Sequence, residues 1–359
     1  MTEAGLRVAV VDRAEFPRVK LCAGWLSTPV WDALEMSPSD YSAGLWEWSR
    51  CHVHFNDGLY TARGRGYFIR RFEFDHVLLG RSGAEAVHHN VKTIARDGDG
   101  WVIDDVARCT FLIGAGGTHC PVARALFPKK PMRPVGVQEH EFPADQQAVA
   151  KARVGQDGEP ELLLHSDLRG YSWNVPKTDW LNVGCGTAAA KEVRGAWTDA
   201  RELFVSSGHV PADSVEQLDR MQGHSYYLFH PEHLARVDLD NAFIVGDSVG
   251  LAQPLTAEGI LPAIVSGRLC GEAIASGAPE TYGDALRSHS LVRDYTAYFR
   301  ARERASGLRG GSGKSRQLPR PIRTPVRRAA SWAAAHAFAW MFSGKPLPRW
   351  VKAAGRLGD

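Results

Sequence analysis

One carboxylate near the start of the chain stands where a ribose-binding acid would stand. Residues 6–12 form a Val-rich run that ends in Asp12 and follows Ala4 and Gly5. A continuous apolar run of this kind is typical of a strand buried on both faces of a parallel sheet. An acid at the end of such a strand accepts hydrogen bonds from a ribose hydroxyl in dinucleotide-binding βαβ units. Asp12 is therefore a candidate nucleotide contact.

The βαβ unit around Asp12 would begin with a phosphate-binding segment. In such units a glycine fingerprint precedes the acid by about 20 residues, and residues 2–5 would form the last turn of the fingerprint helix. We therefore expect an in-frame upstream stretch of roughly 25 residues that contains Gly-x-Gly-x-x-Gly. The alternative is a parallel sheet that has lost one strand.

Two later segments combine a strand with a glycine turn. Residues 111–117 predict a strand that enters a loop with Gly114 and Gly117. Residues 242–247 predict a buried strand ending in Gly-Asp, before a long helix over 258–276. Small residues at such turns let the backbone approach a pyrophosphate. Free N–H groups at the start of a helix stabilise negative charge.

Three segments together resemble a known family. Residues 8–24, 111–124 and 244–260 are similar, in order and spacing, to FAD-dependent oxidoreductases that include geranylgeranyl reductases, aromatic hydroxylases and flavin-dependent halogenases. The third segment is the most specific, since a plain strand-to-helix turn does not explain Gly-Asp followed by Pro-Leu-Thr-x-Glu-Gly. The resemblance implies an α/β fold. A Rossmann-like FAD-binding domain without its first strand would carry an inserted mixed β-sheet substrate domain and a helical C-terminal tail.

The resemblance also implies roles toward FAD, with NAD(P)H as the expected electron donor. Asp247 would accept hydrogen bonds from the ribityl hydroxyls, and Pro254 would lie against the isoalloxazine ring. The start of the long helix would face the reduced flavin. The predicted cofactor contacts are Asp12, Arg18, Lys20, Gly114, Gly117, Asp247, Gly250, Pro254, Glu258, Gly259 and Ile260.

The chain departs from the family pattern at two of these turns. In the middle segment Gly116 stands where the family has Asp, which affects contacts to the nicotinamide donor or the FAD ribose. In the third segment Ala257 replaces a glycine.

A fourth motif selects the reductase branch. Residues 170–177, followed by 181–186, resemble the Tyr-x-Trp-x-Phe-Pro-Lys…Asn-Val-Gly signature of geranylgeranyl reductases, with Val175 in place of Phe. Alternation places Tyr171, Trp173 and Val175 on one strand face, where they would wall an apolar substrate pocket or simply fill a core. Cys22 stands where prenyl reductases of this type carry a cysteine. The candidate catalytic residues are Cys22, Tyr171 and Trp173.

These segments divide the chain. Residues 1–45, 70–127 and 237–280 would form a discontinuous FAD-binding domain, and residues 46–69 and 128–236 the substrate-binding domain. A helical segment over 281–305, a linker over 306–323 and a basic amphipathic helix and tail over 324–359 would follow.

The charge of the chain is concentrated at its C-terminal end. Residues 301–359 contain 13 Lys and Arg but 2 Asp and Glu, whereas the rest contains 30 and 38. This asymmetry favours contact with an anionic lipid or phosphate surface. Thr324 and Pro325 predict a helix start, and Gly344 its end. The helix would either pack on the protein body or lie at a membrane interface.

The six cysteines include no CxxC pair, and the chain does not open with a signal peptide. A cytoplasmic protein, peripheral at the membrane at most, is the simplest interpretation. His52 and His54 share one strand face, but two ligands make a poor zinc site, so no metal is predicted. No nucleic-acid partner is expected, and the oligomeric state is left open.

The resulting hypothesis is a flavin-dependent reductase. Hydride from flavin N5 would reduce a carbon–carbon double bond of an apolar, isoprenoid-like substrate. A flavin monooxygenase or halogenase acting on an aromatic or polyketide compound is the rival enzyme. A truncated, flavin-poor and non-catalytic chain is the third hypothesis, and it predicts that the chain as given purifies without flavin absorbance.

Overall fold

The computed structural model describes residues 1–359 except 57, 131–133, 153–158, 178, 310–319 and 346–359, with backbone alone at 305–309 and 320–327. Its largest element is an eight-stranded sheet in the order β14–β10–β13–β12–β11–β3–β4–β2. Neighbours pair antiparallel, except for the parallel pair β3–β11. The strands are β2 (Trp25–Ser27), β3 (Leu45–Phe55), β4 (Gly58–Ile69), β10 (Val135–Pro143), β11 (Glu161–Leu164), β12 (Gly170–Lys177), β13 (Trp180–Thr187) and β14 (Gln222–Tyr226).

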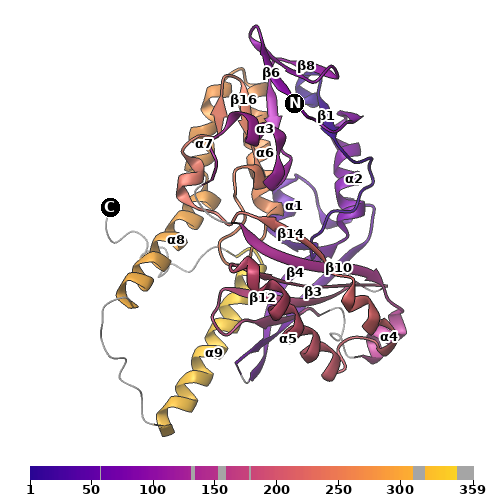
Figure 1. The fold of residues 1–359 in the computed structure, drawn as a ribbon, viewed down its shortest axis with the longest axis vertical. Helices are drawn as coiled ribbons and strands as arrows, with labels where there is room; N and C mark the ends of the chain where they lie inside the picture. Colours follow the sequence, from indigo (N-terminus) through magenta and orange to yellow (C-terminus); the bar gives the residue numbers. More distant parts are fainter. Residues whose placement is uncertain (57, 131–133, 153–158, 178, 310–319, 346–359) are drawn as a thin grey trace.

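Smaller sheets form the upper half of the molecule in Figure 1. β1 (Ala9–Asp12) pairs in parallel with β5 (Glu85–His88). β9 (Leu112–Gly114) pairs in parallel with β16 (Ala242–Ile244), which pairs antiparallel with β15 (Asp238–Leu239). A third sheet holds β6 (Ile94–Asp97), β7 (Gly100–Ile103) and β8 (Ala107–Cys109). The predicted mixed α/β architecture is thus confirmed.

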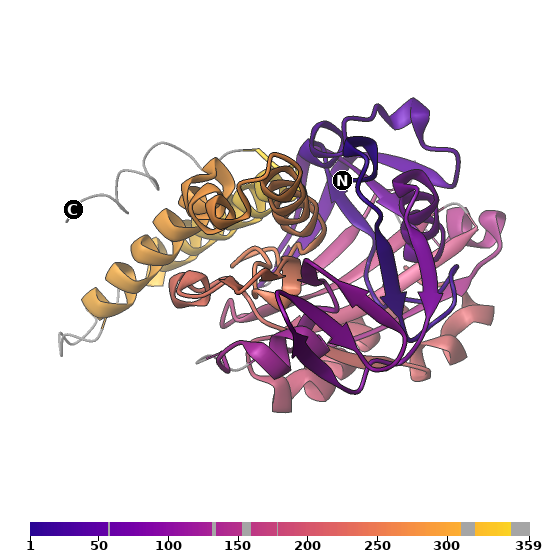
Figure 2. The same cartoon turned by 90° about the horizontal axis from the view of Figure 1, so that it is seen from above.

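Helices flank both halves of the fold. Seen from above, the helices of the C-terminal part gather at one side (Figure 2). Around the small sheets lie α1 (Pro29–Ala33), α2 (Arg71–Ser82), α3 (Pro121–Leu126), α6 (Ile260–Ala275), α7 (Tyr282–Ser288) and α8 (Ser290–Arg309). The large sheet carries α4 (Gln146–Lys151), α5 (Val193–Ser206) and α9 (Arg320–Phe342).

Strand β1 is the main departure from the expected fold. The sequence predicts a strand buried on both faces, but Ala9 is exposed and Val10, Val11 and Asp12 are half-buried. The physical reason is that β1 pairs with β5 alone among the described strands. Residues Thr2–Ala4 do form a helical turn, closed by Gly5 with a φ of 77°.

The two faces of the large sheet bury different cores. The inner face is defined by Tyr171, Trp173 and Val175, which contact the apolar side of α9. The outer face is defined by Leu181, Val183 and Cys185, which contact α5 through a separate apolar cluster. Alternation along β12 and β13 produces this division, because neighbouring residues of a strand point to opposite faces.

The tail helix begins earlier than expected. The sequence predicts a start at Thr324, but α9 starts at Arg320 and includes Pro321 in its first turn, where a missing N–H has no intrahelical partner to lose. Likewise, α8 extends to Arg309, so the first residues of the predicted linker are helical. The end is as predicted, since α9 stops at Phe342 and Gly344 has a φ of 68°.

Helix α9 packs on the protein body. Its buried residues Ala335, Phe338, Ala339 and Phe342 belong to the inner-face core, whereas Trp332 is 55% exposed. Among the described residues, no helix is both long and apolar enough to cross a membrane.

Candidate functional site

The turn between β16 and α6 carries a buried acceptor without a partner. Asp247 follows β16, and its Oδ1 is buried without a hydrogen-bond partner. A Cβ at Gly259 would lie 3.0 Å from this oxygen, so the backbone passes close to the carboxyl group. Burial raises the pKa of Asp247, while the charges of Lys20 and Arg71 oppose the rise. The carboxyl group is therefore placed to accept hydrogen bonds from a bound hydroxyl.

Glycines at two neighbouring turns bring the backbone of both loops together. Gly117 has a φ of 73° and its N–H donates to Ser248 Oγ at 3.0 Å, which donates back to the Gly117 carbonyl at 3.2 Å. Gly250 has a φ of 85°, and a Cβ there would lie 2.7 Å from His233 Nδ1. Gly114 has a packing role, since a Cβ there would meet Val122 at 2.8 Å.

The N-terminus of α6, which follows this turn, is not capped by a side chain. Gly259 and Ile260 form its first positions. Pro254 is buried in the turn before the helix. This turn is held by Gln253, whose side-chain oxygen accepts from the backbone N–H groups of Leu255 and Thr256 at 2.5 Å each. Gln253 is a site residue that the sequence analysis missed.

The side chain of Glu258 is hydrogen-bonded to strand β2 of the large sheet. Its Oε1 accepts a hydrogen bond from Ser27 Oγ at 2.7 Å, which ties the turn to β2 of the large sheet. Burial raises the pKa of Glu258 to about 7. Its side chain therefore anchors the turn, and its backbone would be the part that faces a cofactor.

Asp12 and Arg18 contact each other at the end of β1. Arg18 Nε lies 3.2 Å from Asp12 Oδ2, and Arg18 Nη1 lies 3.4 Å from Asp75 Oδ2. Asp12 Oδ1 accepts from the backbone N–H of Ala14 at 2.9 Å. The carboxyl group that would bind ribose is thus held in place by its own loop.

The loop after β1 connects Asp12 with the large sheet. It contains Lys20, whose pKa is lowered first by the charge of Arg71 and raised in part by Asp247. Arg71 is itself paired with Asp75 at 2.7 and 2.8 Å. Basic and acidic groups of three separate segments therefore meet where this loop passes the β16–α6 turn.

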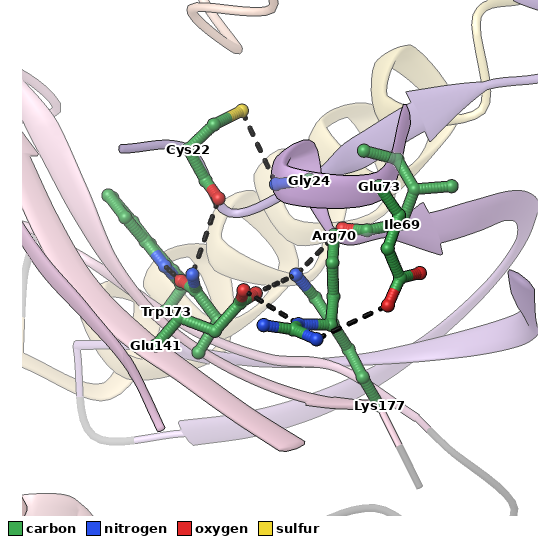
Figure 3. A network of polar contacts seen from close by, with 9 residues as sticks. Cys22, Gly24, Ile69, Arg70, Glu73, Glu141, Trp173 and Lys177 are labelled. Carbon is green, nitrogen blue, oxygen red and sulfur yellow. Dashed lines mark hydrogen bonds and ion pairs between the residues drawn. The ribbon is translucent and has the colours of Figure 1, made fainter. Parts of the chain in front are cut away.

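Cys22 lies where the same loop reaches the inner face (Figure 3). Its carbonyl accepts from Asn182 Nδ2 at 3.3 Å, and Asn182 Oδ1 accepts from Trp173 Nε1 at 2.7 Å. The N–H of Gly24 donates to Cys22 Sγ at 3.3 Å. Burial raises the pKa of the Cys22 thiol, and the charge of Arg71 opposes the rise. The thiol is therefore neutral at pH 7.

Beneath the loop, a buried lysine ties three strands together (Figure 3). Lys177 is fully buried, and its Nζ donates to the Ile69 carbonyl at 2.8 Å and to Glu141 Oε1 at 2.5 Å. Arg70 Nε donates to the other Glu141 oxygen at 3.1 Å. Gly24 passes so close that a Cβ would lie 1.9 Å from the Ile69 carbonyl oxygen, which only glycine allows.

Glu139 is a buried acid of this region with a raised pKa. It is 2% exposed, its Oε2 has no hydrogen-bond partner, and the nearby backbone of Cys22 opposes the rise of its pKa. Burial raises its pKa to about 8, against the opposing charge of Lys177. Glu139 therefore carries a proton at neutral pH, beside Cys22.

Tyr171 and Trp173 line the inner face as the alternation predicts. Tyr171 Oη donates to the Thr256 carbonyl at 2.5 Å, which joins β12 to the turn before α6. Its ring lies 5.3 Å from that of Phe338 and 5.6 Å from that of Phe342. The aromatic face of β12 is thus packed against α9 in one hydrophobic core cluster.

The structure brings most predicted site residues to one region. Asp247, Gly250, Pro254, Gly259 and Ile260 surround the β16–α6 turn, and the loop after β1 runs from Asp12 past it to Cys22. Sequence reasoning missed Glu139, Glu141 and Gln253. Alternation along β10, which puts Glu139 and Glu141 on the same face as Val135 and Val137, is the signal that could have found the two acids.

The fold is that of flavin-dependent halogenases. The myxobacterial chondrochloren halogenase CndH superposes with a TM-score of 0.62 at 14% identity, covering 99% of this chain and 91% of the halogenase. The flavin-dependent halogenase CmlS gives 0.61 at 15% identity, over 99% and 73%.

Sequence relatives lie among the prenyl reductases. The chain is 28% identical to a chloroplastic geranylgeranyl diphosphate reductase of Oryza sativa subsp. japonica over 196 residues, which are 52% of this chain and 38% of the relative. It is 21% identical over 334 residues to digeranylgeranylglycerophospholipid reductase 3 of Methanosphaera stadtmanae, covering 83% and 81%. No family model matches the chain. The resemblance to the geranylgeranyl reductase group of FAD-dependent oxidoreductases is thereby confirmed.

Proposed function

We propose that the protein is an FAD-dependent enzyme that reduces carbon–carbon double bonds of an apolar, isoprenoid-like substrate. The observation that carries this proposal is a pair of groups with raised pKa beside the aromatic face of β12, the half-buried thiol of Cys22 and the buried carboxyl group of Glu139. Reduction of an alkene needs one hydride and one proton. Two neutral acids at pH 7 supply the proton side of that requirement.

The residues of the β16–α6 turn fit FAD. Asp247 offers an unpartnered buried oxygen to the ribityl hydroxyls, and the uncapped start of α6 at Gly259 and Ile260 offers N–H groups to a negative edge. Gly117 and Gly250 have positive φ and shape the backbone of the two loops that would approach a pyrophosphate. Asp12, with Arg18 beside it, is the proposed ribose contact. Bound FAD would supply the hydride, with NAD(P)H as the proposed donor of electrons.

The chain's own residues would position the substrate and the proton. The rings of Tyr171 and Trp173 exclude water and favour an apolar chain. Trp173 Nε1 donates to Asn182, and Asn182 donates to the carbonyl of Cys22, so the backbone of Cys22 is held at the inner face. Either Cys22 or Glu139 would then donate the proton to the substrate carbon. The tail helix is proposed to approach a lipid surface through its outer side, which carries Arg328 and Trp332.

An anaerobic experiment tests the proposal. The protein is loaded with FAD, reduced with dithionite and mixed with geranylgeranyl diphosphate under argon. We expect flavin absorbance to return as the alkene is reduced. Glu139→Gln or Cys22→Ser should slow this return about 100-fold, the size of a lost general acid. The matched control Cys109→Ser, at a half-buried thiol on β8, should not.

Reoxidation by oxygen is the competing outcome. If the prenyl substrate leaves the reduced flavin unchanged under argon, and an aromatic substrate instead stimulates oxygen consumption, the protein is a monooxygenase or halogenase and the proposal is wrong.

A further inference from the structure

Two histidines and a glutamate converge on the outer face of the large sheet. His54 comes from β3, Glu161 from β11, and His209 from the loop after α5. One potential ligand atom of each lies within 4.8 Å of the other two. Glu161 is 4% exposed, so its carboxyl group is held inside the protein. Two strands and one loop, far apart in sequence, thus bring nitrogen and oxygen ligands together.

Both imidazole rings approach the same carboxylate oxygen. His54 Nε2 contacts Glu161 Oε1, and His209 Nδ1 lies 2.6 Å from that same oxygen. The His209 contact is not aligned as a hydrogen bond, since the buried Nδ1 has no hydrogen-bond partner. In the present contact Glu161 Oε1 accepts from His54 Nε2–H. A cation placed between the three atoms would instead be bound by lone pairs of both imidazole nitrogens and of the carboxylate oxygen.

A buried amide beside the cluster also has an unused oxygen. Asn174 lies directly opposite Glu161 in the β11–β12 pair, and it is fully buried. Its Nδ2 donates to the His209 carbonyl at 2.8 Å, while its Oδ1 is buried without a partner. Such an unsatisfied buried acceptor is costly unless a ligand or water completes it.

The neighbouring histidine shows what an ordinary ion-pair cluster looks like in this sheet. His52 Nε2 lies 2.6 Å from Glu159 Oε2, and His52 Nδ1 lies 3.0 Å from Thr61 Oγ1. Arg50 contacts the other Glu159 oxygen. Both ring nitrogens have partners there and an arginine already supplies the positive charge, so no cation is needed.

We propose that His54, Glu161 and His209 bind one divalent transition-metal ion of the zinc class. Two imidazoles and one carboxylate are a ligand set that Zn²⁺ accepts, with a water completing four-coordination. Ligand atoms around tetrahedral zinc are about 3.3 Å apart, as metal–ligand distances of about 2.0 Å require. The 2.6 Å contact must therefore lengthen by less than about 1 Å. The side chains of His54 and His209 are 15% and 21% exposed, which leaves a route for the ion.

The metal would be a structural cross-link between elements of the fold and not a catalyst. It would join β3 and β11 to the loop after α5 on the outer face, whereas Trp173 belongs to the inner-face core and Cys22 is hydrogen-bonded to Asn182 on that side. Its binding energy would therefore add to the stability of the folded protein. The proposal is independent of the proposed redox activity.

Zinc binding to the tag-free full chain tests the proposal. The protein is stripped with EDTA, dialysed, and titrated with Zn²⁺ against a chromophoric chelator while thermal unfolding is followed in parallel. We expect one zinc per chain and a higher Tm with zinc. His209→Ala and Glu161→Gln should weaken binding by at least about 100-fold and remove the Tm shift.

The matched control is His52→Ala, which removes the neighbouring histidine and should keep both zinc binding and the Tm shift. Circular dichroism checks that each variant is folded, and His54→Ala replaces His209→Ala if the latter is not. Absence of stoichiometric zinc in the wild-type protein overturns the proposal. So does equal loss of zinc in His52→Ala, because the histidines would then bind without selectivity.

Discussion

Asp247 is the residue on which cofactor binding depends most in this account. Its Oδ1 is buried and lacks a partner, so a flavin hydroxyl would complete it. We expect Asp247→Asn to weaken FAD binding about 10- to 100-fold, as for a lost hydrogen bond to a charged group. Quenching of FAD fluorescence on binding measures this. Asp240→Asn, at an exposed turn, is the control, and an equal effect there would count against the assignment.

The raised pKa of Glu139 predicts that the stability of the protein depends on pH. Its pKa is raised from 4.5 to about 8 by burial, so the folded state holds a proton that the unfolded state releases. The protonated carboxyl group therefore contributes to the free energy of unfolding. This contribution is fully present below pH 4.5 and is lost as the pH rises to about 8. Glu139→Gln cannot ionise, so its Tm relative to wild type should increase across that window.

Thermal unfolding of both proteins between pH 4.5 and 8 measures the difference. A constant difference in Tm at every pH would show that the carboxyl group of Glu139 is not protonated in the folded protein.

At the scale of elements, the turn before α6 contains a strained residue. Ala257 has a φ of 60°, a left-handed conformation that costs an L-residue about 1 kcal/mol or more. We expect Ala257→Gly to raise the free energy of unfolding by about 0.5–1 kcal/mol. Chemical denaturation checks this. Ala263→Gly, inside helix α6, should have the opposite sign by about 1 kcal/mol, and a destabilised Ala257→Gly would refute the strain.

Phe342 packs the end of helix α9 against the large sheet. Phe342 is 5% exposed, and its ring centroid lies 4.3 Å from that of Trp25 and 5.6 Å from that of Tyr171. Phe342→Ala should lower the free energy of unfolding by about 3 kcal/mol, because a buried ring leaves a cavity. Trp332→Ala, at a 55% exposed position, should change it by less than about 0.5 kcal/mol. Similar losses in both variants would mean that α9 does not pack as described.

Elements whose sequence signals lie within one short segment could be predicted from the sequence. The β16–α6 turn follows from a buried run, Gly-Asp and a helix start within about 20 residues, and the structure places all three as expected. Strand β1 was predicted correctly, but the prediction that both of its faces are buried was wrong. Burial depends on which strands stand next to it, and residues 6–12 carry no information about their neighbours.

At the scale of the whole molecule, the contacts that define the site join distant segments. Asn182 bonds Cys22 across 160 positions, and Lys177 bonds Ile69 across 108. Alternation predicts the face on which each residue lies, but not the partner it meets there. The convergence of His54 with Glu161 and His209 was hidden for the same reason.

The charge of the molecule is distributed unevenly along the chain. The basic tail follows a body with an excess of acids, and the described part of α9 packs on that body while Arg328 and Trp332 stay exposed. Contact of this helix with an anionic lipid surface stays a prediction.

The most direct test of the central claim is the mass of the product formed from geranylgeranyl diphosphate by the FAD-loaded, reduced protein in deuterated water. We expect each reduced double bond to gain two solvent-derived deuterium atoms, because the N5 hydrogen of the dithionite-reduced flavin also comes from the deuterated water, and we expect no added oxygen or halogen. Unchanged substrate together with an oxygenated or halogenated aromatic product would contradict it.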